Sequence, residues 1–361
     1  MQLRRMCLDN PKLFNQTAYF LTVPDYICAK LTGQPVVDLS NAGINQLTDI
    51  RAERYDPFIL DFLGVQESQL AKLMPSCSPV GTLTSEAASA LGLCKSVIVS
   101  TGCHDQYAVA LGAGICKAGD AVIGTGTAWA VTALRDSPDF DSKLSQSRSP
   151  VAGIWGTMVS ISTGGVCLDW FRKNVAGLDG MPVDYNVLND LVSKRSEPGA
   201  GGLLFYPYFN GAVQPNPDSV SRATLLGLDL SHDRGHIVRA IMEGVACQTV
   251  WALHSLEARQ SVQRLFLSGG ATKSTVWTQI IAEITGRPLH VPQVPELACV
   301  GAAIMAGVGC GLFQDCADGV RRLVPNILTL QPEAKQVSAY QRIYDRYCRR
   351  AKVLKAVYEE D

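Results

Sequence analysis

The chain has 361 residues, of which 47% are hydrophobic and 18% charged, and its formal net charge is −1. This is the composition of a globular protein long enough for two domains, and the balanced charge argues against a nucleic acid or an anionic membrane as partner. Because no apolar run reaches the roughly 20 residues that span a bilayer, and the first residues lack an apolar signal core, we expect a cytoplasmic protein.

The first third of the chain predicts helices and loops that lead to one short strand. Residues 80–93, VGTLTSEAASALGL, predict a turn and then a helix that is capped by Ser85 and ends at Gly92. Residues 96–102, SVIVSTG, predict a buried strand. A glycine-containing turn then leads into a predicted helix of small residues.

The pattern changes after this part of the chain, where β-branched and apolar residues surround a Gly-Thr turn. Residues 120–134, DAVIGTGTAWAVTAL, predict a strand, a tight turn and a second strand. We therefore place a domain boundary between Lys117 and Asp120, which gives one domain at 1–118 and another at 119–361.

The second domain alternates strands with helices. A double glycine at 164–165 opens a predicted helix, and another at 269–270 joins a strand to a helix closed by Gly286. Residues 236–258 predict a long helix, and 296–313 predict a helix of small residues that must pack closely against a neighbour. This alternation favours an α/β architecture.

Three glycine turns in this domain follow predicted strands, at 124–127, 164–165 and 269–270. Glycine permits close backbone approach and helix N-termini present unpaired N–H groups, so these turns suit phosphate, although most double glycines are only turns. The P-loop, G-x-G-x-x-G, G-x-S-x-G and H-E-x-x-H patterns are absent. The 5 histidines and 12 cysteines lack metal-ligand spacing, so we assign no metal ligands and interpret the cysteines as buried free thiols.

Several motifs, taken together, resemble the FGGY family of carbohydrate kinases. Residues 223–244, ATLLGLDLSHDRGHIVRAIMEG, fit the C-terminal signature of that family. Residues 268–289 are similar to its adenosine-side segment, and 295–309 to its E-x-x-A-x-G-A-A helix. Shorter matches follow in the order of the family at 23–33, 124–129 and 207–218. The resemblance extends from about Pro11 to Val324.

The resemblance implies an α/β fold of two actin-like, ribonuclease H-like domains, the first for the sugar and the second for ATP. It implies transfer of the γ-phosphoryl group of ATP, with Mg²⁺, to a hydroxyl of a sugar or polyol. Family members begin with a strand and a D-x-G-T-T phosphate loop, and this chain starts after that segment, so the resemblance implies an incomplete first domain. A truncated, non-catalytic nucleotide-binding fragment or interaction protein is therefore the alternative hypothesis.

The resemblance also implies a catalytic residue. The catalytic base of the family is an aspartate in a glycine-rich loop, and Asp105 in GCHDQ matches it. Read from the residues alone, Asp105 is a helix cap, and the two roles are compatible if one carboxylate oxygen stays free. Gln106 falls at a substrate-contacting position or is an exposed helix residue. His104 is a further candidate substrate contact, or a hydrogen-bonded loop histidine.

On the nucleotide side, the resemblance implies contacts from all three glycine turns. The implied nucleotide-binding residues are Gly124, Thr125, Gly126, Thr127, Gly165, Asp169, Gly269, Gly270, Ala271 and Ser274. The alternatives are a hairpin turn at 124–127 and ordinary helix starts at the other two turns. Asp169 needs an explanation, because an acid repels phosphates unless magnesium or distance intervenes.

The GCHDQ loop is more similar to the pentulose branch of the family than to its glycerol kinases, so the resemblance implies a ketopentose such as xylulose as the substrate. The expected partners are a small-molecule sugar or polyol and ATP, and a homodimer is left open. Other residues of the matched motifs are interpreted as structural. Glu243 is expected to be a buried acid paired within the helix layer, and Gly301, Ala302 and Ala303 are expected to permit close helix packing.

Overall fold

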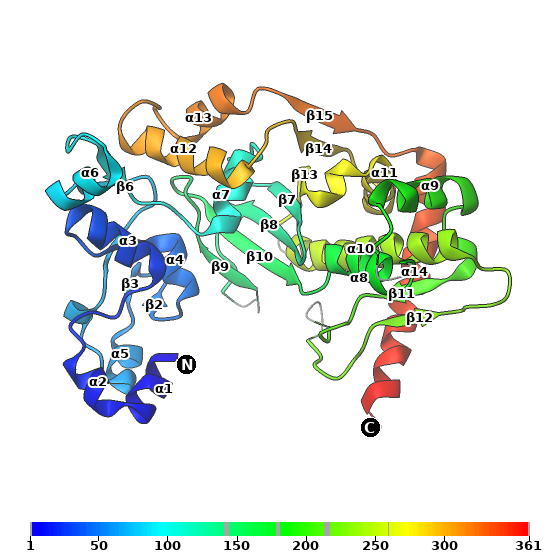
Figure 1. Ribbon diagram of the computed structural model, residues 1–361, viewed down its shortest axis with the longest axis horizontal. Helices are drawn as coiled ribbons and strands as arrows, with labels where there is room; N and C mark the ends of the chain where they lie inside the picture. The colour runs from blue at the N-terminus through cyan, green and yellow to red at the C-terminus, as the bar shows by residue number, and fades with distance from the viewer. Residues whose placement is uncertain (1, 141–143, 178–180, 213–216, 259, 360–361) are drawn as a thin grey trace. The chain divides into compact units, whose positions relative to one another are not determined.

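The computed structural model describes residues 2–140, 144–177, 181–212, 217–258 and 260–359 (Figure 1). The chain folds into two compact units, each assembled from three segments. The first unit comprises Met1–Ala118, Leu134–Gly156 and Val294–Pro325. The second comprises Gly119–Ala133, Thr157–Gln293 and Asn326–Asp361. Residues 213–216, within the matched motif at 207–218, lie outside the described residues.

The first unit consists mainly of helices with short strand pairs between them. Its helices are α1 (Gln2–Asp9), α2 (Pro11–Gln16), α3 (Val23–Thr32), α4 (Leu39–Ile44), α5 (Pro57–Leu63), α6 (Ser85–Leu91), α7 (Asp105–Gly112), α12 (Leu297–Gly309) and α13 (Cys316–Leu323). Its strands are β1 (Val36–Asp38), β2 (Thr48–Asp49), β3 (Arg54–Tyr55), β4 (Lys72–Met74), β5 (Pro79–Thr82), β6 (Ile98–Ser100) and β9 (Ser145–Arg148). β1 pairs with β4 in parallel, and β5 pairs with β6 antiparallel.

Two local expectations for this unit need correction. The N-cap of α6 is Thr84, whose hydroxyl accepts a hydrogen bond from the N–H of Ala87, and Ser85 is the first helical residue. The end of α6 at Gly92, in the left-handed conformation, confirms the prediction. β6 is not a buried strand, because it pairs only with β5 in a two-stranded sheet and leaves Ile98 46% exposed.

Helices α7 and α12 pack closely through glycines. A Cβ atom at Gly301 would lie 2.0 Å from the carbonyl oxygen of Ala108, and one at Gly112 would lie 1.9 Å from that of Leu297. Only residues without a Cβ allow this approach. The prediction is confirmed for Gly301 but wrong for Ala302 and Ala303, which are exposed.

The second unit is built on a mixed sheet. Within this unit, the neighbouring strands of the sheet follow the order β15-β14-β13-β7-β8-β10 (Figure 1). The strands are β7 (Asp120–Thr125), β8 (Trp129–Arg135), β10 (Trp155–Ile161), β11 (Leu204–Tyr206), β12 (Thr224–Leu226), β13 (Arg264–Gly269), β14 (Leu289–Pro292) and β15 (Ile327–Leu330). The helices are α8 (Gly165–Asn174), α9 (Tyr185–Arg195), α10 (Arg234–Glu257), α11 (Thr275–Thr285) and α14 (Ala334–Glu359). The predicted α/β alternation is confirmed in this unit.

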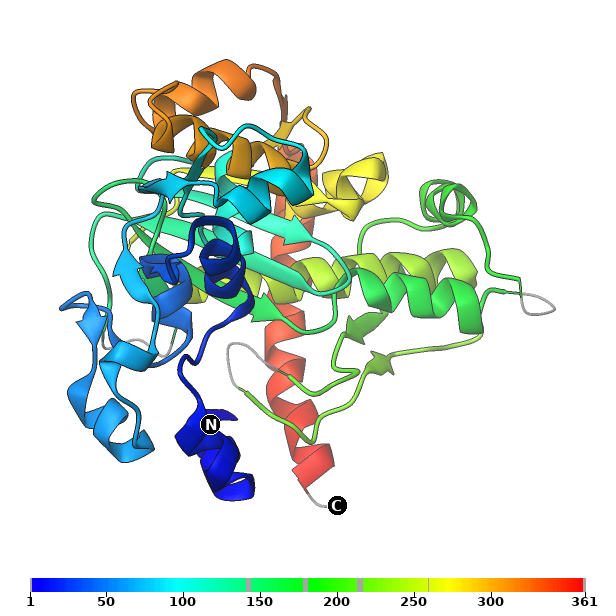
Figure 2. The same ribbon diagram turned by 60° about the vertical axis from the view of Figure 1, so that its left-hand side comes forward.

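The sheet brings two of the glycine turns together. β7 and β8 form the predicted antiparallel hairpin, and β13 runs parallel to β7 with Gly269 opposite Thr125. The hairpin turn and the turn after β13 therefore start from neighbouring strand ends. The core beneath them includes Ile123 and Leu267, both fully buried. The long helix α10 packs against α9, α11 and α14, the last of these drawn in red in Figure 2. Among the described residues, no helix combines the length and apolarity needed to cross a membrane.

Candidate active site

The predicted nucleotide-binding residues gather around one cavity of the second unit, with a volume of about 590 Å³. Eight of the ten predicted residues line it: Thr125, Gly126, Thr127, Gly165, Asp169, Gly270, Ala271 and Ser274. They come from three segments that are far apart in the sequence. The β7–β8 turn, the start of α8 and the turn between β13 and α11 thus meet at one place.

The other two predicted glycines support this cavity without lining it. Gly124 lies within β7 and pairs with Ser268 on one side and Ala130 on the other. Gly269 has φ +91° and ψ −158°, a conformation open essentially only to glycine. A Cβ atom there would lie 2.7 Å from the carbonyl oxygen of Thr125. Gly269 therefore lets β13 turn immediately beside the end of β7.

The Thr125 hydroxyl joins the two turns. It donates a hydrogen bond to the carbonyl oxygen of Ser268, at 2.5 Å, and accepts one from the N–H of Ala271, at 3.0 Å. Thr125 is 3% exposed, so both bonds are protected from water. In this conformation the hydroxyl proton is engaged within the protein, and Thr125 acts by fixing the position of the β13–α11 turn.

The hairpin turn also caps α8. The N–H groups of Gly165 and Val166 donate to the carbonyl oxygens of Gly126 and Thr127, at 3.2 and 3.1 Å. A Cβ atom at Gly165 would lie 2.5 Å from the Gly126 oxygen, so a glycine is required at this contact. These first amides of α8 are engaged by the hairpin, whereas the turn residues Gly126 and Thr127 are exposed.

Asp169 is surrounded by cationic and hydroxyl groups. Its carboxylate lies 2.8 Å from Arg172 Nε and 2.6 Å from Lys173 Nζ, and it accepts a hydrogen bond from the Tyr185 hydroxyl at 3.1 Å. Burial works to raise the pKa of Asp169, but the hydrogen bonds from Lys173, Arg172 and Tyr185 outweigh it and hold this pKa below its usual value. Neighbouring cations therefore balance the negative charge of Asp169. This local pairing is a third way, besides magnesium and distance, to reduce the repulsion between the carboxylate and bound phosphates.

Ser274 caps α11 and connects it to α9. Its hydroxyl accepts from the N–H of Trp277 at 3.1 Å and donates to Asn189 Oδ1 at 2.7 Å. The local sequence pattern does not indicate that α9 forms part of the cavity wall. Cavity residues that were not predicted to contact the nucleotide are Trp129, Val166, Leu168, Asp184, Tyr185, Asn186, Asn189, Lys273 and Trp277. Asp184 could be recognised as an N-cap from the sequence, but a cap does not indicate which cavity the helix borders.

No cluster that could hold a metal ion, meaning three or more histidine, cysteine or acidic side chains together, occurs in the described part of the chain. Two acidic residues, Asp169 and Asp184, line the cavity. Magnesium that accompanies a nucleotide needs only one or two protein carboxylates, because phosphates and waters supply the remaining oxygens. The cavity is thus compatible with a nucleotide that brings its own magnesium.

Asp105 is the first residue of α7, and its side chain is 75% exposed. The cap of this helix is His104, whose Nδ1 accepts from the N–H of Gln106 at 3.3 Å, so the interpretation of Asp105 as the cap residue is wrong. His104 Nδ1 also lies 3.2 Å from Asp105 Oδ1. It can accept from Gln106 or, when protonated, donate to Asp105, but not both at once.

A buried network supports the loop that carries Asp105. The N–H of His104 donates to Ser40 Oγ at 2.8 Å, and the Ser40 hydroxyl in turn donates to the buried carboxylate of Asp38. Asp38 also accepts from the N–H groups of Ser40 and Asn41 at the start of α4. The backbone at His104 is therefore fixed, and the Asp105 carboxylate beside it faces solvent.

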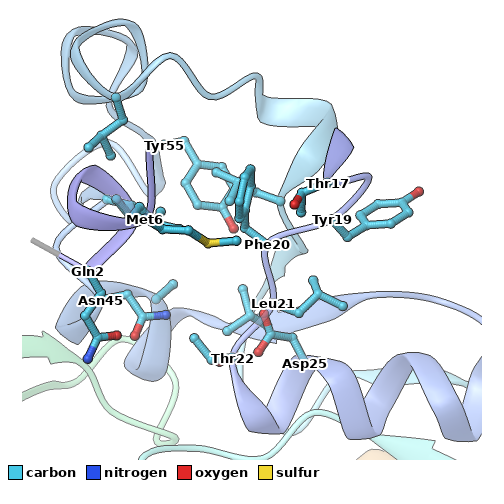
Figure 3. A pocket seen from close by; sticks show the side chains of 16 residues that line it. Gln2, Met6, Thr17, Tyr19, Phe20, Leu21, Thr22, Asp25, Asn45 and Tyr55 are labelled. Carbon is cyan, nitrogen blue, oxygen red and sulfur yellow. Dashed lines mark hydrogen bonds between the residues drawn. The ribbon is translucent and has the colours of Figure 1, made fainter. Parts of the chain in front are cut away.

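A second cavity lies within the first unit and has a volume of about 690 Å³ (Figure 3). Met6, Phe20 and Tyr55 lie near its centre in the view, and the buried Asp25 lies at its edge. Asp25 accepts a hydrogen bond from Thr22, and the Tyr55 hydroxyl donates to the carbonyl oxygen of Ala71. None of the residues predicted for the site lines this cavity.

Comparison with known proteins identifies the same family in both parts of the chain. Residues 2–112 and 120–310 match, respectively, the N-terminal and C-terminal domains of the FGGY family of carbohydrate kinases. The chain is 28% identical to a xylulose kinase of Bacillus subtilis (strain 168), over 93% of this chain and 67% of that protein. It is 30% identical to an L-xylulose/3-keto-L-gulonate kinase of Escherichia coli (strain K12), over 96% of this chain and 68% of that protein.

The fold also matches solved structures. The crystal structure of xylulose kinase from Rhodospirillum rubrum aligns with a TM-score of 0.91 and 28% identity, over 99% of this chain and 72% of that one. The expected two-domain, actin-like α/β fold is thereby confirmed. The chain spans about two thirds of the length of the curated kinases that it matches, and 61% in the case of an autoinducer-2 kinase of Enterobacter sp. (strain 638).

Proposed function

Because the chain belongs to the FGGY family of carbohydrate kinases, we propose that it transfers the γ-phosphoryl group of Mg-ATP to a hydroxyl of a sugar or polyol. The observation that carries this proposal is the convergence of eight predicted nucleotide-binding residues on one cavity. A fold alone would not support an activity, because one fold can host many chemistries. Here the glycine turns and the cavity supply the specific support.

The proposed general base is Asp105. A sugar hydroxyl is a weak nucleophile, and a carboxylate that accepts its proton as the new O–P bond forms lowers the barrier. The 75% exposure of the side chain leaves at least one oxygen free to reach a bound substrate. The hydrogen bond from the His104 N–H to Ser40 positions the backbone next to Asp105, and Gln106 and His104 are proposed to contact the substrate beside it.

The proposed nucleotide site is the cavity of the second unit. The exposed turn residues Gly126 and Thr127 are proposed to contact the terminal phosphates, while Thr125 and Gly269 shape the turns behind them. The adenosine is proposed to lie beside the turn that contains Gly270, Ala271 and Ser274, next to Asn189 of α9.

Asp169 is proposed to line the site as the partner of Arg172 and Lys173 and not as a direct phosphate contact.

A ketopentose is the proposed acceptor. Support comes from a relative named as a xylulose kinase and another named as an L-xylulose/3-keto-L-gulonate kinase, together with the GCHDQ loop. A gluconokinase of Bacillus licheniformis is 26% identical over 98% of this chain, so a sugar acid is the competing acceptor. A panel containing both classes decides between them by comparison of kcat/KM.

The proposal is tested by measuring ADP release from ATP with that panel of sugars and polyols. The full chain is expected to turn over at least one sugar, and Asp105→Asn to lower kcat by about 10²-fold or more while the Kd for ADP changes little. The matched control is Asp61→Asn, which removes an exposed carboxylate elsewhere in the first unit and should leave kcat unchanged. ADP binding without turnover of any sugar would instead support a non-catalytic nucleotide-binding protein.

A further inference from the structure

Two cysteines of the first unit, 239 positions apart in the sequence, face each other in its interior. The Sγ atoms of Cys77 and Cys316 are 3.8 Å apart, and the two residues are only 9% and 5% exposed. Both thiols also lie near the carbonyl oxygen of Pro150, at 3.8 and 3.4 Å. A disulfide needs an S–S distance of about 2.05 Å, so a small rotation or shift of the side chains would bring the sulfurs together.

The pair is connected to the segment that carries Asp105. The N–H of Cys77 donates to the carbonyl oxygen of Thr101, and the Thr101 N–H returns a hydrogen bond to the carbonyl of Ser78. Cys316 is the first residue of α13, which packs against α7 and α12. One thiol therefore sits on a loop bonded to the strand that leads into Asp105, and the other on a helix that packs against α7.

The two cysteines border a cavity that is large enough for a small molecule. Cys77 and Cys316 both line a cavity of about 580 Å³ within the first unit, together with Pro150, Val151 and Gln314. This volume is within the usual range of small-molecule sites. The cavity therefore offers a small disulfide reagent a route of approach to the two buried thiols.

We propose that Cys77 and Cys316 form a reversible disulfide by exchange with a small-molecule disulfide such as glutathione disulfide. This bond links α13 covalently to the loop beside the Asp105 segment. One cysteine thiolate attacks the reagent, which forms a mixed disulfide and releases one glutathione thiolate. The second cysteine thiolate then attacks the protein sulfur and releases the other glutathione. In sum the two protein thiols lose two protons and two electrons, and glutathione disulfide is reduced to two glutathione molecules.

The environment predicts a slow reaction. The hydrogen bond to Cys77, together with burial, raises the pKa of Cys316 above its ordinary value, so the reactive thiolate is scarce at neutral pH. The exposed cysteines Cys94, Cys299 and Cys310 should be modified first, as mixed disulfides. The Cys77–Cys316 bond should form later. It forms because, once one of the two cysteines carries glutathione, the thiol of the other lies close enough to displace it.

The test is to incubate the full chain with glutathione disulfide and digest it without reduction. Peptide mass spectrometry is expected to find a Cys77–Cys316 crosslink that dithiothreitol removes. Cys77→Ser and Cys316→Ala should each abolish this crosslink, and Cys94→Ser, which removes an exposed thiol, should leave its yield unchanged. A digest without the Cys77–Cys316 crosslink would overturn the proposal, whether the two cysteines stay reduced, carry only glutathione or are crosslinked to other cysteines.

A second measurement tests whether the disulfide restrains the segment that carries Asp105, and it does not depend on any kinase activity. Amide hydrogen exchange over residues 101–112 is expected to slow by about threefold or more in the oxidised protein and to recover after reduction. The Cys316→Ala variant should show no such change under the same treatment. A crosslinked protein with unaltered exchange in this segment would overturn the claim that the disulfide restrains it.

Discussion

At the scale of single residues, Asp169 shows how an acidic side chain can line a cavity that is proposed to bind phosphates. Its carboxylate is part of the cavity wall, but Arg172 and Lys173 follow it at helical spacing and contact it directly. Acidic and basic residues three and four positions apart lie on the same face of a helix. This pattern is readable in the sequence LDWFRKN, whereas the contact from Tyr185 depends on tertiary structure.

We predict that Asp169→Asn strengthens nucleotide binding. The substitution removes a negative charge from the cavity wall and leaves Arg172 and Lys173 without their partner, so the phosphates meet a more positive site. The Kd for ADP without magnesium should fall about threefold to tenfold, measured by isothermal titration calorimetry. The control is Asp190→Asn on α9, which breaks a similar pair with Lys194 outside the cavity and should leave the Kd unchanged. Weaker binding in Asp169→Asn would mean that Asp169 contacts the nucleotide or its metal ion favourably.

At the scale of elements, the position of Asp105 depends on the contact between α7 and α12. Gly112 and Gly301 bring the two helices so close that backbone atoms of one meet the glycine of the other. The sequence predicts close packing of 296–313 from its small residues, but not which of them face the neighbour, because small residues occur all around the helix. Local patterns thus predict the helix, whereas its packing partner depends on contacts between distant segments.

We predict that Gly301→Ala destabilises this helix pair. The added Cβ would lie 2.0 Å from the Ala108 carbonyl oxygen, so the helices must separate, which we expect to cost about 2 kcal/mol or more in the free energy of unfolding. Urea denaturation measures this change, and kcat for the sugar should fall with it because α7 carries Asp105, the proposed general base. The control is Ala302→Ser on the exposed face of α12, which should change the stability by about 0.5 kcal/mol or less. Equal stability of the two variants would contradict the close packing.

At the scale of the whole molecule, each compact unit is assembled from three chain segments. Periodicity and turn residues predict the β7–β8 hairpin, the strand and helix around Gly269 and the end of α11 at Gly286, because these features are encoded within short windows. The return of residues 294–325 to the first unit has no local signal. The same holds for the α9 wall of the cavity and for the Cys77–Cys316 contact, which depend on pairing across the chain.

One buried acid is expected to make the stability of the protein depend on pH. Glu243, on α10, accepts hydrogen bonds from the Gly199 N–H and the Tyr340 hydroxyl, and lies 3.8 Å from Arg239. This confirms the expected burial and pairing. Its other carboxylate oxygen is buried without a hydrogen-bond partner in the described part of the chain. Burial raises the pKa of Glu243 to about 7, against the opposing effects of Gly199, Arg239 and Tyr340.

The sign of the resulting effect follows from the two pKa values. The folded protein holds a proton on Glu243 up to about pH 7, whereas the unfolded chain releases it near the ordinary value of 4.5. The contribution of this group to stability is therefore fully present below pH 4.5 and is lost as the pH rises to about 7. Glu243→Gln cannot titrate, so the unfolding free energy of the wild type relative to this variant should fall by on the order of 3 kcal/mol across that range. Urea denaturation at several pH values measures the difference, and Glu333→Gln, at an exposed position, should track the wild type. A wild-type curve that stays parallel to that of Glu243→Gln would show that Glu243 is already ionised in the folded protein at pH 5.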